Sequence, residues 1–141
     1  MPEVFTDHWA KACAQELNTR PSYREAALTW EGAIVLVMAP EGGGGETTGR
    51  SVLLDLWHGE CRHARVATGE DLDAARYVLQ GTPAIWREVL AGRLAPILAI
   101  MTGKLRLAKG SFAGLVPYVN AAKELVAAAM AVETTFPEAF A

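Results

Sequence analysis

The chain has 141 residues, of which 51% are apolar and 21% are charged, and its net charge at pH 7 is −3. These values predict a folded chain with a real hydrophobic core rather than a disordered one. A mildly acidic chain without a basic run also argues against a nucleic-acid-binding protein, because such proteins concentrate positive charge.

Two cysteines are too few for a disulfide framework. No apolar stretch approaches the roughly 18 residues that cross a bilayer. The start, MPEVFTDHW, lacks the basic residues and apolar core of a secretory signal. We therefore expect a soluble cytoplasmic protein with one domain, residues 1–141, in which residues 1–4 and 133–141 are less ordered.

The first predicted element is an amphipathic helix that Thr6 or Asp7 caps and that runs to about Leu17, because apolar residues recur every four positions. A second short helix is expected over residues 22–28, after a break that contains Pro21. The residues on the stripe of the first helix are Phe5, Trp9, Cys13 and Leu17.

Three strands are expected next, in hairpin order. Residues 30–39 are apolar on both alternating faces, which predicts a central strand covered by protein on both sides, or by protein on one and a partner on the other. After the glycines at 42–45, residues 51–58 form a strand, and a tight turn leads to a more polar strand over residues 61–67. The second of these strands places Val52, Leu54 and Leu56 on one face.

Residues 71–73 are predicted as a loop and residues 75–80 as a fourth strand. On that strand, Ala75, Tyr77 and Leu79 are expected to share a face.

Thr82 and Pro83 suit the start of a helix that Gly92 ends, and Pro96 opens a short helix over residues 97–101. A fifth strand over residues 104–109 and a long helix to about Val132 complete the order. Strands and helices that are largely segregated predict an α+β fold with one five-stranded, largely antiparallel sheet.

Few side chains suggest chemistry. The glycines at 42–45 lack the Gly-Lys-Ser/Thr ending of a phosphate-binding loop and join two strands, so a turn is expected. His58, Cys61 and His63 could form a metal site or a Cys-His pair, with Cys61 and His63 pointing the same way. Glu60 is near, but the sequence offers no second ligand pair for a metal and no orienting Asn or Asp for a catalytic pair. We predict no catalytic residue, no metal site and no cofactor.

Two other groups have ordinary explanations. The acidic cluster Glu70, Asp71 and Asp73 lacks the glycine and glutamate of a calcium loop, so it reads as a solvated turn. Trp9 and Trp86 lie on apolar helix faces and are expected in the core or in the wall of a pocket.

The apolar middle of the chain is more informative. The helix expected over residues 97–101 carries no charge, and such a helix must be buried, yet a small domain has limited interior. The apolar surface left over must face a ligand, another subunit or a membrane. We favour a cavity or an interface.

The run LAGRLAPILAIMTGKLRLAKG, residues 90–110, resembles the sterol carrier protein type 2 family. The chain as a whole resembles a free-standing bacterial member of that family. The resemblance implies a five-stranded sheet with helices over one face that enclose an apolar tunnel. It also implies binding of a fatty acid, fatty acyl-CoA, phospholipid or sterol-like lipid without transforming it. Carried onto this chain, the tunnel wall would comprise Ile85, Val89, Leu94, Ile97, Leu98, Met101, Leu105, Leu107, Leu115 and Val119.

Two departures from the family pattern stand out. Ala108 adds a residue before the glycine that ends the last strand, which predicts a β-bulge or a shifted end to the strand. The final residues, EAFA, lack a peroxisomal signal.

The expected partner is a lipid or an acyl-chain molecule, with transient membrane contact, as a monomer or homodimer and without nucleic acid. The alternatives are a homodimerising or partner-binding module without a lipid, and, behind it, a small metal protein or enzyme that uses His58, Cys61 and His63.

Overall fold

The computed structural model describes residues 3–39 and 50–135. Its centre is a five-stranded sheet in the order β3-β2-β1-β4-β5. Every neighbouring pair is antiparallel except β1 and β4, which run parallel. The predicted α+β class with a largely antiparallel sheet is therefore confirmed. The strands are β1 (Glu31–Met38), β2 (Arg50–Trp57), β3 (Glu60–Val66), β4 (Tyr77–Gly81) and β5 (Arg106–Lys109).

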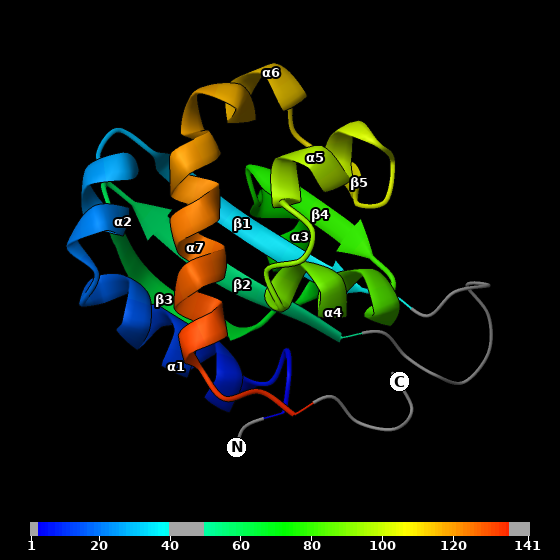
Figure 1. Ribbon diagram of the computed structural model, residues 1–141, viewed down its shortest axis with the longest axis horizontal. Coiled ribbons are helices and arrows are strands. Elements are labelled where there is room, and N and C mark those ends of the chain that lie inside the picture. Colours follow the sequence, from blue (N-terminus) through cyan, green and yellow to red (C-terminus); the bar gives the residue numbers. More distant parts are fainter. Residues whose placement is uncertain (1–2, 40–49, 136–141) are drawn as a thin grey trace.

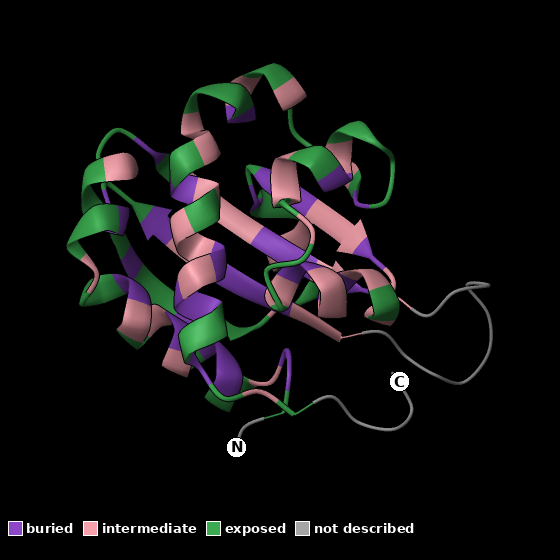
Figure 2. Cartoon of the chain, viewed as in Figure 1, coloured by how far each residue is buried: buried purple, intermediate pink, exposed green. Residues whose placement is uncertain are grey.

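Most of the helices form a layer on one face of the sheet. Figure 1 shows α7 crossing that face, with α1 and α2 on one side of it and α4 and α5 on the other. Buried residues concentrate on the strands and on the helix sides that face them (Figure 2). The elements of this layer are α1 (Asp7–Asn18), α2 (Pro21–Ala26), α4 (Pro83–Leu90), α5 (Pro96–Met101), α6 (Phe112–Leu115), the 3₁₀ turn η1 (Val116–Tyr118) and α7 (Val119–Ala131).

The local signals explain most of these boundaries. Thr6 caps α1 through a hydrogen bond from the Trp9 N–H to its hydroxyl, and Thr82 caps α4 in the same way through Ile85. Both hydroxyls satisfy an N–H group that has no partner within the helix. The predicted starts of these two helices are confirmed.

Strand β1 is apolar on both faces, and protein covers both. Ile34 and Leu36 belong to the core beneath the helix layer. Val35 is fully buried on the other side, in a smaller cluster to which Leu72 contributes. Of the two alternatives for this strand, cover by protein on both sides is the correct one.

The expected loop over residues 71–73 is instead part of a helix, α3 (Gly69–Ala74), on the second face of the sheet. Its start is a capping box, in which the Asp71 N–H donates to the Thr68 hydroxyl and the Thr68 N–H donates to the Asp71 carboxylate. A single acidic turn has too little apolar periodicity to be recognised as a helix, although the Thr-x-x-Asp spacing fits a cap. Ala75 ends this helix and packs on the second face, so the prediction that it shares a face with Tyr77 is wrong.

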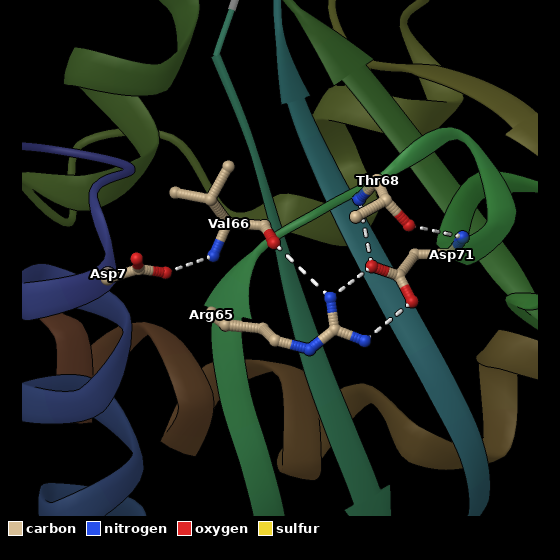
Figure 3. Close-up of polar contacts among 5 residues, drawn as sticks. All are labelled: Asp7, Arg65, Val66, Thr68 and Asp71. Atoms are coloured by element: carbon tan, nitrogen blue, oxygen red, sulfur yellow. Dashed lines mark hydrogen bonds and ion pairs between the residues drawn. The ribbon is translucent and has the colours of Figure 1, made fainter.

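A bidentate ion pair ties α3 to strand β3. The Arg65 guanidinium donates to both oxygens of Asp71, at 2.5 and 2.8 Å, and the neighbouring Val66 N–H donates to Asp7 of α1 at 2.6 Å (Figure 3). The hydrogen bond from Arg65 is the main reason that the pKa of the Asp71 carboxyl is lowered, and the Thr68 N–H adds to the effect. The acidic cluster is thus an anchored helix start.

Two further predictions are corrected at the C-terminal side. The single helix expected to run to about Val132 is divided into α6, η1 and α7, because Pro117 has no N–H to donate within a helix. The last strand begins at Arg106 rather than at residue 104, since the Leu105 N–H donates to the Ala99 carbonyl of α5.

The predicted irregularity at Ala108 is confirmed. Val78 pairs with Lys109, whereas the next residue, Leu79, pairs with Leu107. Ala108 is therefore the extra residue of a β-bulge on the edge strand.

The described parts of the two chain ends contact each other. The Val4 N–H donates to the Thr135 carbonyl at 2.9 Å, and Val4 is fully buried. Glu3 forms an isolated parallel bridge with Thr135. The glycines at 42–45 lie outside the described residues.

Gly110→Ala should lower the free energy of unfolding by at least about 2 kcal/mol. Gly110 has a φ of +104°, and a Cβ there would lie 2.2 Å from Tyr77 Cδ1. Gly69→Ala is the matched control, because nothing lies within 4 Å of its Cβ position, and it should be neutral or slightly stabilising. Urea unfolding of both variants checks this, and equal effects would contradict it.

Asp71→Asn should destabilise the protein at neutral pH, with the difference from wild type shrinking as the pH falls below about 4. A carboxyl whose pKa is depressed by folding stabilises the native state above its unfolded pKa, and loses that contribution as the pH falls through the folded value. Thermal unfolding across pH measures the difference. Asp73→Asn is the control, since the Asp73 carboxylate has no ion pair within the described residues, and an equal pH-dependent loss there would refute a specific role for Asp71.

Candidate functional site

An apolar cavity lies between the sheet and the helix layer. It offers about 90 Å³ of space to the centre of a water-sized molecule, and it is partly open to solvent. None of the residues that line it is charged. Concave sites with a mostly apolar lining are typical of sites for small hydrophobic ligands.

The floor of the cavity follows from strand alternation. Successive residues of a strand point to opposite faces, so every second side chain faces the helices. The floor consists of Ile34 and Leu36 from β1, Leu54 and Leu56 from β2, and Leu79 from β4.

The hollow arises where helix α7 presents small side chains to the sheet. Ala121, Ala122 and Ala129 line the cavity, and only Leu125 and Val126 add bulk between them. Alanine methyl groups fill little of the volume between a helix and a sheet, so space remains. Two short helices, α4 and α5, close the cavity on the side of β4 and β5.

Aromatic rings form much of the remaining wall, and their polar atoms are bonded to the protein. The indole N–H of Trp30 donates to the Gly32 carbonyl at 2.8 Å, and that of Trp86 donates to the Val37 carbonyl at 2.8 Å. The Trp9 indole N–H donates to the Thr134 hydroxyl at 3.0 Å. The rings are therefore available for contact with an apolar molecule. The predicted positions of Trp9 and Trp86 in the core or pocket wall are confirmed.

Burial favours the neutral forms of two titratable groups at the cavity, Cys13 and Tyr23. Burial is the largest cause of a rise in the pKa of the Cys13 thiol to about 12, and the nearby Cys61 adds to it. Burial likewise raises the pKa of the Tyr23 hydroxyl well above its usual range. A lining without charge can hold an apolar molecule without desolvating a charged group.

Four of the ten residues predicted for a tunnel wall are brought together at the cavity: Val89, Ile97, Leu105 and Leu115. The half-buried Ile85, Leu94 and Leu107 pack against the core without lining the cavity, and Val119 is half-buried in the first turn of α7. Leu98 and Met101 point outward, with 51% and 67% of their surface exposed. Their exposure is the apolar surface that a domain with limited interior was expected to leave over on this helix. Contact of any of the ten with a ligand stays a prediction.

Sequence reasoning missed the part of the wall supplied by α2, by the residue before β1, by η1 and by most of α7. Tyr23, Trp30, Tyr118 and the alanines of α7 all line the cavity. A usable signal was the small-residue composition of VNAAKELVAAAMA, which fills little volume for a helix that packs on a sheet.

His58, Cys61 and His63 do not converge. His58 Nε2 lies 2.6 Å from Glu31 Oε2, and Cys61 is buried. The prediction that Cys61 and His63 point the same way is wrong, because a register shift in β2–β3 pairs Cys61 with Leu56 on the core side and His63 with Asp55 on the other side. Within residues 3–39 and 50–135, no group of three or more histidine, cysteine or acidic side chains could hold a metal ion.

The fold and cavity define a small α+β container for an apolar molecule. No family model and no curated protein matches the chain. Solved structures do match the chain. A crystal structure of sterol carrier protein 2 is 46% identical with a TM-score of 0.83, over 93% of this chain and 100% of that one.

A second solved structure agrees. It is a conserved hypothetical protein from Thermus thermophilus, described as possibly a sterol carrier protein, and it is 45% identical with a TM-score of 0.83 over 96% of this chain and 93% of that one. Sterol carrier protein 2 of Yarrowia lipolytica, in its apo form, shares the fold at 20% identity and a TM-score of 0.54, over 85% and 88% of the two chains. The chain belongs to the sterol carrier protein 2 family.

Both cysteines should resist thiol reagents in the folded protein at mildly alkaline pH. Their pKa values are raised to about 12 and both are buried, so little reactive thiolate forms. The absorbance of a chromogenic disulfide reagent measures the reaction, with protein unfolded in urea as the control that labels fully. Fast labelling of the native protein would contradict the buried, neutral state of the two thiols.

Proposed function

We propose that this protein binds a lipid with a long apolar chain in the cavity and carries it without transforming it. The observation that carries the proposal is the uncharged, apolar lining of a cavity between the sheet and the helix layer. Membership of a family whose solved members are named sterol carrier protein supports it.

Desolvation supplies the driving force. Burying a methylene gains about 0.8 kcal/mol, so a twelve-carbon chain gains about 9 kcal/mol. Ordering of the chain and loss of its free motion reduce this gain, which leaves affinities around micromolar within reach. Such binding favours any ligand of suitable length and width, and the proposal covers fatty acids, fatty acyl-CoA, phospholipids and sterol-like molecules.

The contacts that we propose for the chain are the four predicted residues at the cavity, Val89, Ile97, Leu105 and Leu115, together with aromatic rings such as Trp30. Ile97 is the most useful of them for experiment. It lies on the cavity side of α5, whereas the next residue, Leu98, is half exposed on the outer side.

The cytoplasmic location is part of the same proposal, and so is action as a monomer or homodimer. Within the described part of the chain, no helix has the length and apolar character to cross a bilayer. A partner-binding module without a lipid is the competing function. It predicts an assembly on size measurement and no lipid in organic extracts.

Freshly purified protein should show a mass excess that matches a lipid in gentle native mass spectrometry. The physical reason is that an apolar cavity without charge retains hydrophobic molecules from the cell. Absence of a mass excess, together with failure to bind fluorescent acyl probes, would end the carrier proposal.

Ile97→Asp should weaken binding of a fluorescent acyl probe about tenfold or more, because a carboxylate in an apolar wall must be desolvated when the ligand enters. Leu98→Asp is the matched control on the same helix and should leave the affinity within about twofold. Fluorescence titration measures both affinities, and circular dichroism checks the fold.

A second substitution keeps this test decisive if Ile97→Asp is poorly folded. Ala122→Leu remains apolar and fills part of the cavity from α7, so it should also reduce binding of long chains. Unchanged affinity in folded Ile97→Asp and in Ala122→Leu would show that probes bind elsewhere.

A further inference from the structure

Helix α5, with the sequence PILAIM, has two apolar sides. Ile97 and Ile100 line the cavity. Leu98 and Met101 lie on the outer side with 51% and 67% of their surface exposed. A helix at a protein surface normally carries polar side chains on its outer face, so the outer face of α5 has the composition of a contact surface.

The segment around this helix is purely basic. Residues 89–123 contain no aspartate or glutamate and five lysines or arginines, whereas the rest of the chain has twice as many acidic residues as basic ones. Arg93 in this segment pairs with Glu88, and Lys109 donates to the Asp73 carbonyl. Lys104 and Arg106 are exposed, and neither has a hydrogen bond or an ion pair to any residue in the described part of the chain.

We propose that α5, through Leu98 and Met101, together with Lys104 and Arg106, docks on the surface of an anionic phospholipid bilayer. Lys104 follows Met101 by three residues, a span of at most about 10 Å, so a cation and an apolar side chain can engage one patch of lipid together. Apolar side chains between cations match the boundary between acyl chains and anionic headgroups. This inference rests on the proposed function.

Charge also determines which face of the protein approaches the bilayer, and it favours a bilayer over a second copy of the chain as the partner of this patch. A chain with a net charge of −3 is repelled overall by an anionic surface, so only its basic segment can approach closely. A second copy of this chain fits less well, because a two-fold contact through the same patch would place basic residues against basic residues.

The position of α5 connects docking to loading. The inner face of the helix lines the cavity, so a lipid that leaves the bilayer beside Leu98 and Met101 has only the width of one helix to pass before it reaches Ile97 and Ile100. A short path reduces the apolar surface that the lipid exposes to water during transfer.

The test is co-sedimentation of the full chain with vesicles of phosphatidylcholine and phosphatidylserine, and with vesicles of phosphatidylcholine alone. We expect binding to the mixed vesicles that weakens with added salt. Lys104→Gln with Arg106→Gln should lower the partition coefficient about fivefold per charge. Leu98→Ser with Met101→Ser should also lower the partition coefficient. This loss should exceed the loss that added salt alone causes for the same protein.

The control variants remove the same number of exposed cations, and a comparably exposed apolar side chain, from other parts of the surface. Lys11→Gln with Arg24→Gln removes two exposed cations from α1 and α2, and Leu28→Ser removes a leucine that is 58% exposed. These variants should bind vesicles like wild type. Equal losses in the controls, or no binding by wild type, would overturn the docking surface. A dimer of wild type that Leu98→Ser with Met101→Ser converts to a monomer would overturn it as well, by assigning the patch to a second copy.

Binding of a dissolved acyl probe separates this inference from the carrier function. All four docking substitutions should leave probe affinity within about twofold of wild type. Probe binding without vesicle binding would overturn docking alone. Vesicle binding without probe binding would support the docking surface and overturn the carrier function.

Discussion

The central strand β1 imposes the constraint on which the architecture depends, because it is apolar on both faces. Ile34 and Leu36 must be shielded on one side, and Val35 on the other. The parallel pairing of β1 with β4 requires a long connection, and that connection supplies both β2–β3 and the cover on the second face, helix α3. The two faces are covered differently. A small helix packs closely on one, whereas a layer of several helices spans the other.

Because of this difference, the second face of the sheet is closely packed, whereas the first face borders the cavity. On the second face, Leu72 and Ala75 pack against Val35, and the Arg65–Asp71 pair holds α3 to the neighbouring strand. On the first face, the alanines of α7 leave space above the leucines of β2. An unfilled apolar space forfeits dispersion contacts, and an apolar guest restores them, so the native fold and an occupied cavity favour each other.

The sequence predicts the elements whose signals are local, and it fails where geometry depends on distant partners. Thr6 and Thr82 each act within a few residues, and the structure has both caps. The bulge at Ala108 was expected from a departure from the family pattern. The opposite sides taken by Cys61 and His63 depend on a register shift against β2, which no residue of β3 indicates by itself. Pro117 was visible in the sequence, yet the apolar register around it suggested one continuous helix.

The cavity was predicted in kind but only partly in composition. Its wall near α5 follows from the resemblance, and Val89, Ile97, Leu105 and Leu115 lie there. The remaining wall comes from helices packed across the sheet, and packing distances between helices cannot be read from periodicity. Leu98 and Ile97 have the same chemistry and adjacent positions, so only the orientation of a six-residue helix decides which of them faces inward.

The tryptophans give the cavity an optical property. Three of the four in the chain, Trp9, Trp30 and Trp86, line it, while Trp57 lies outside it on β2, 38% exposed and beneath the Arg62 guanidinium. Indole emission depends on the polarity of the surroundings, and each of the three lining rings keeps its N–H bonded to the protein. Entry of an apolar guest therefore changes the surroundings of the ring faces alone. The protein carries its own spectroscopic sensor of occupancy, with a fourth indole outside the cavity as an internal reference.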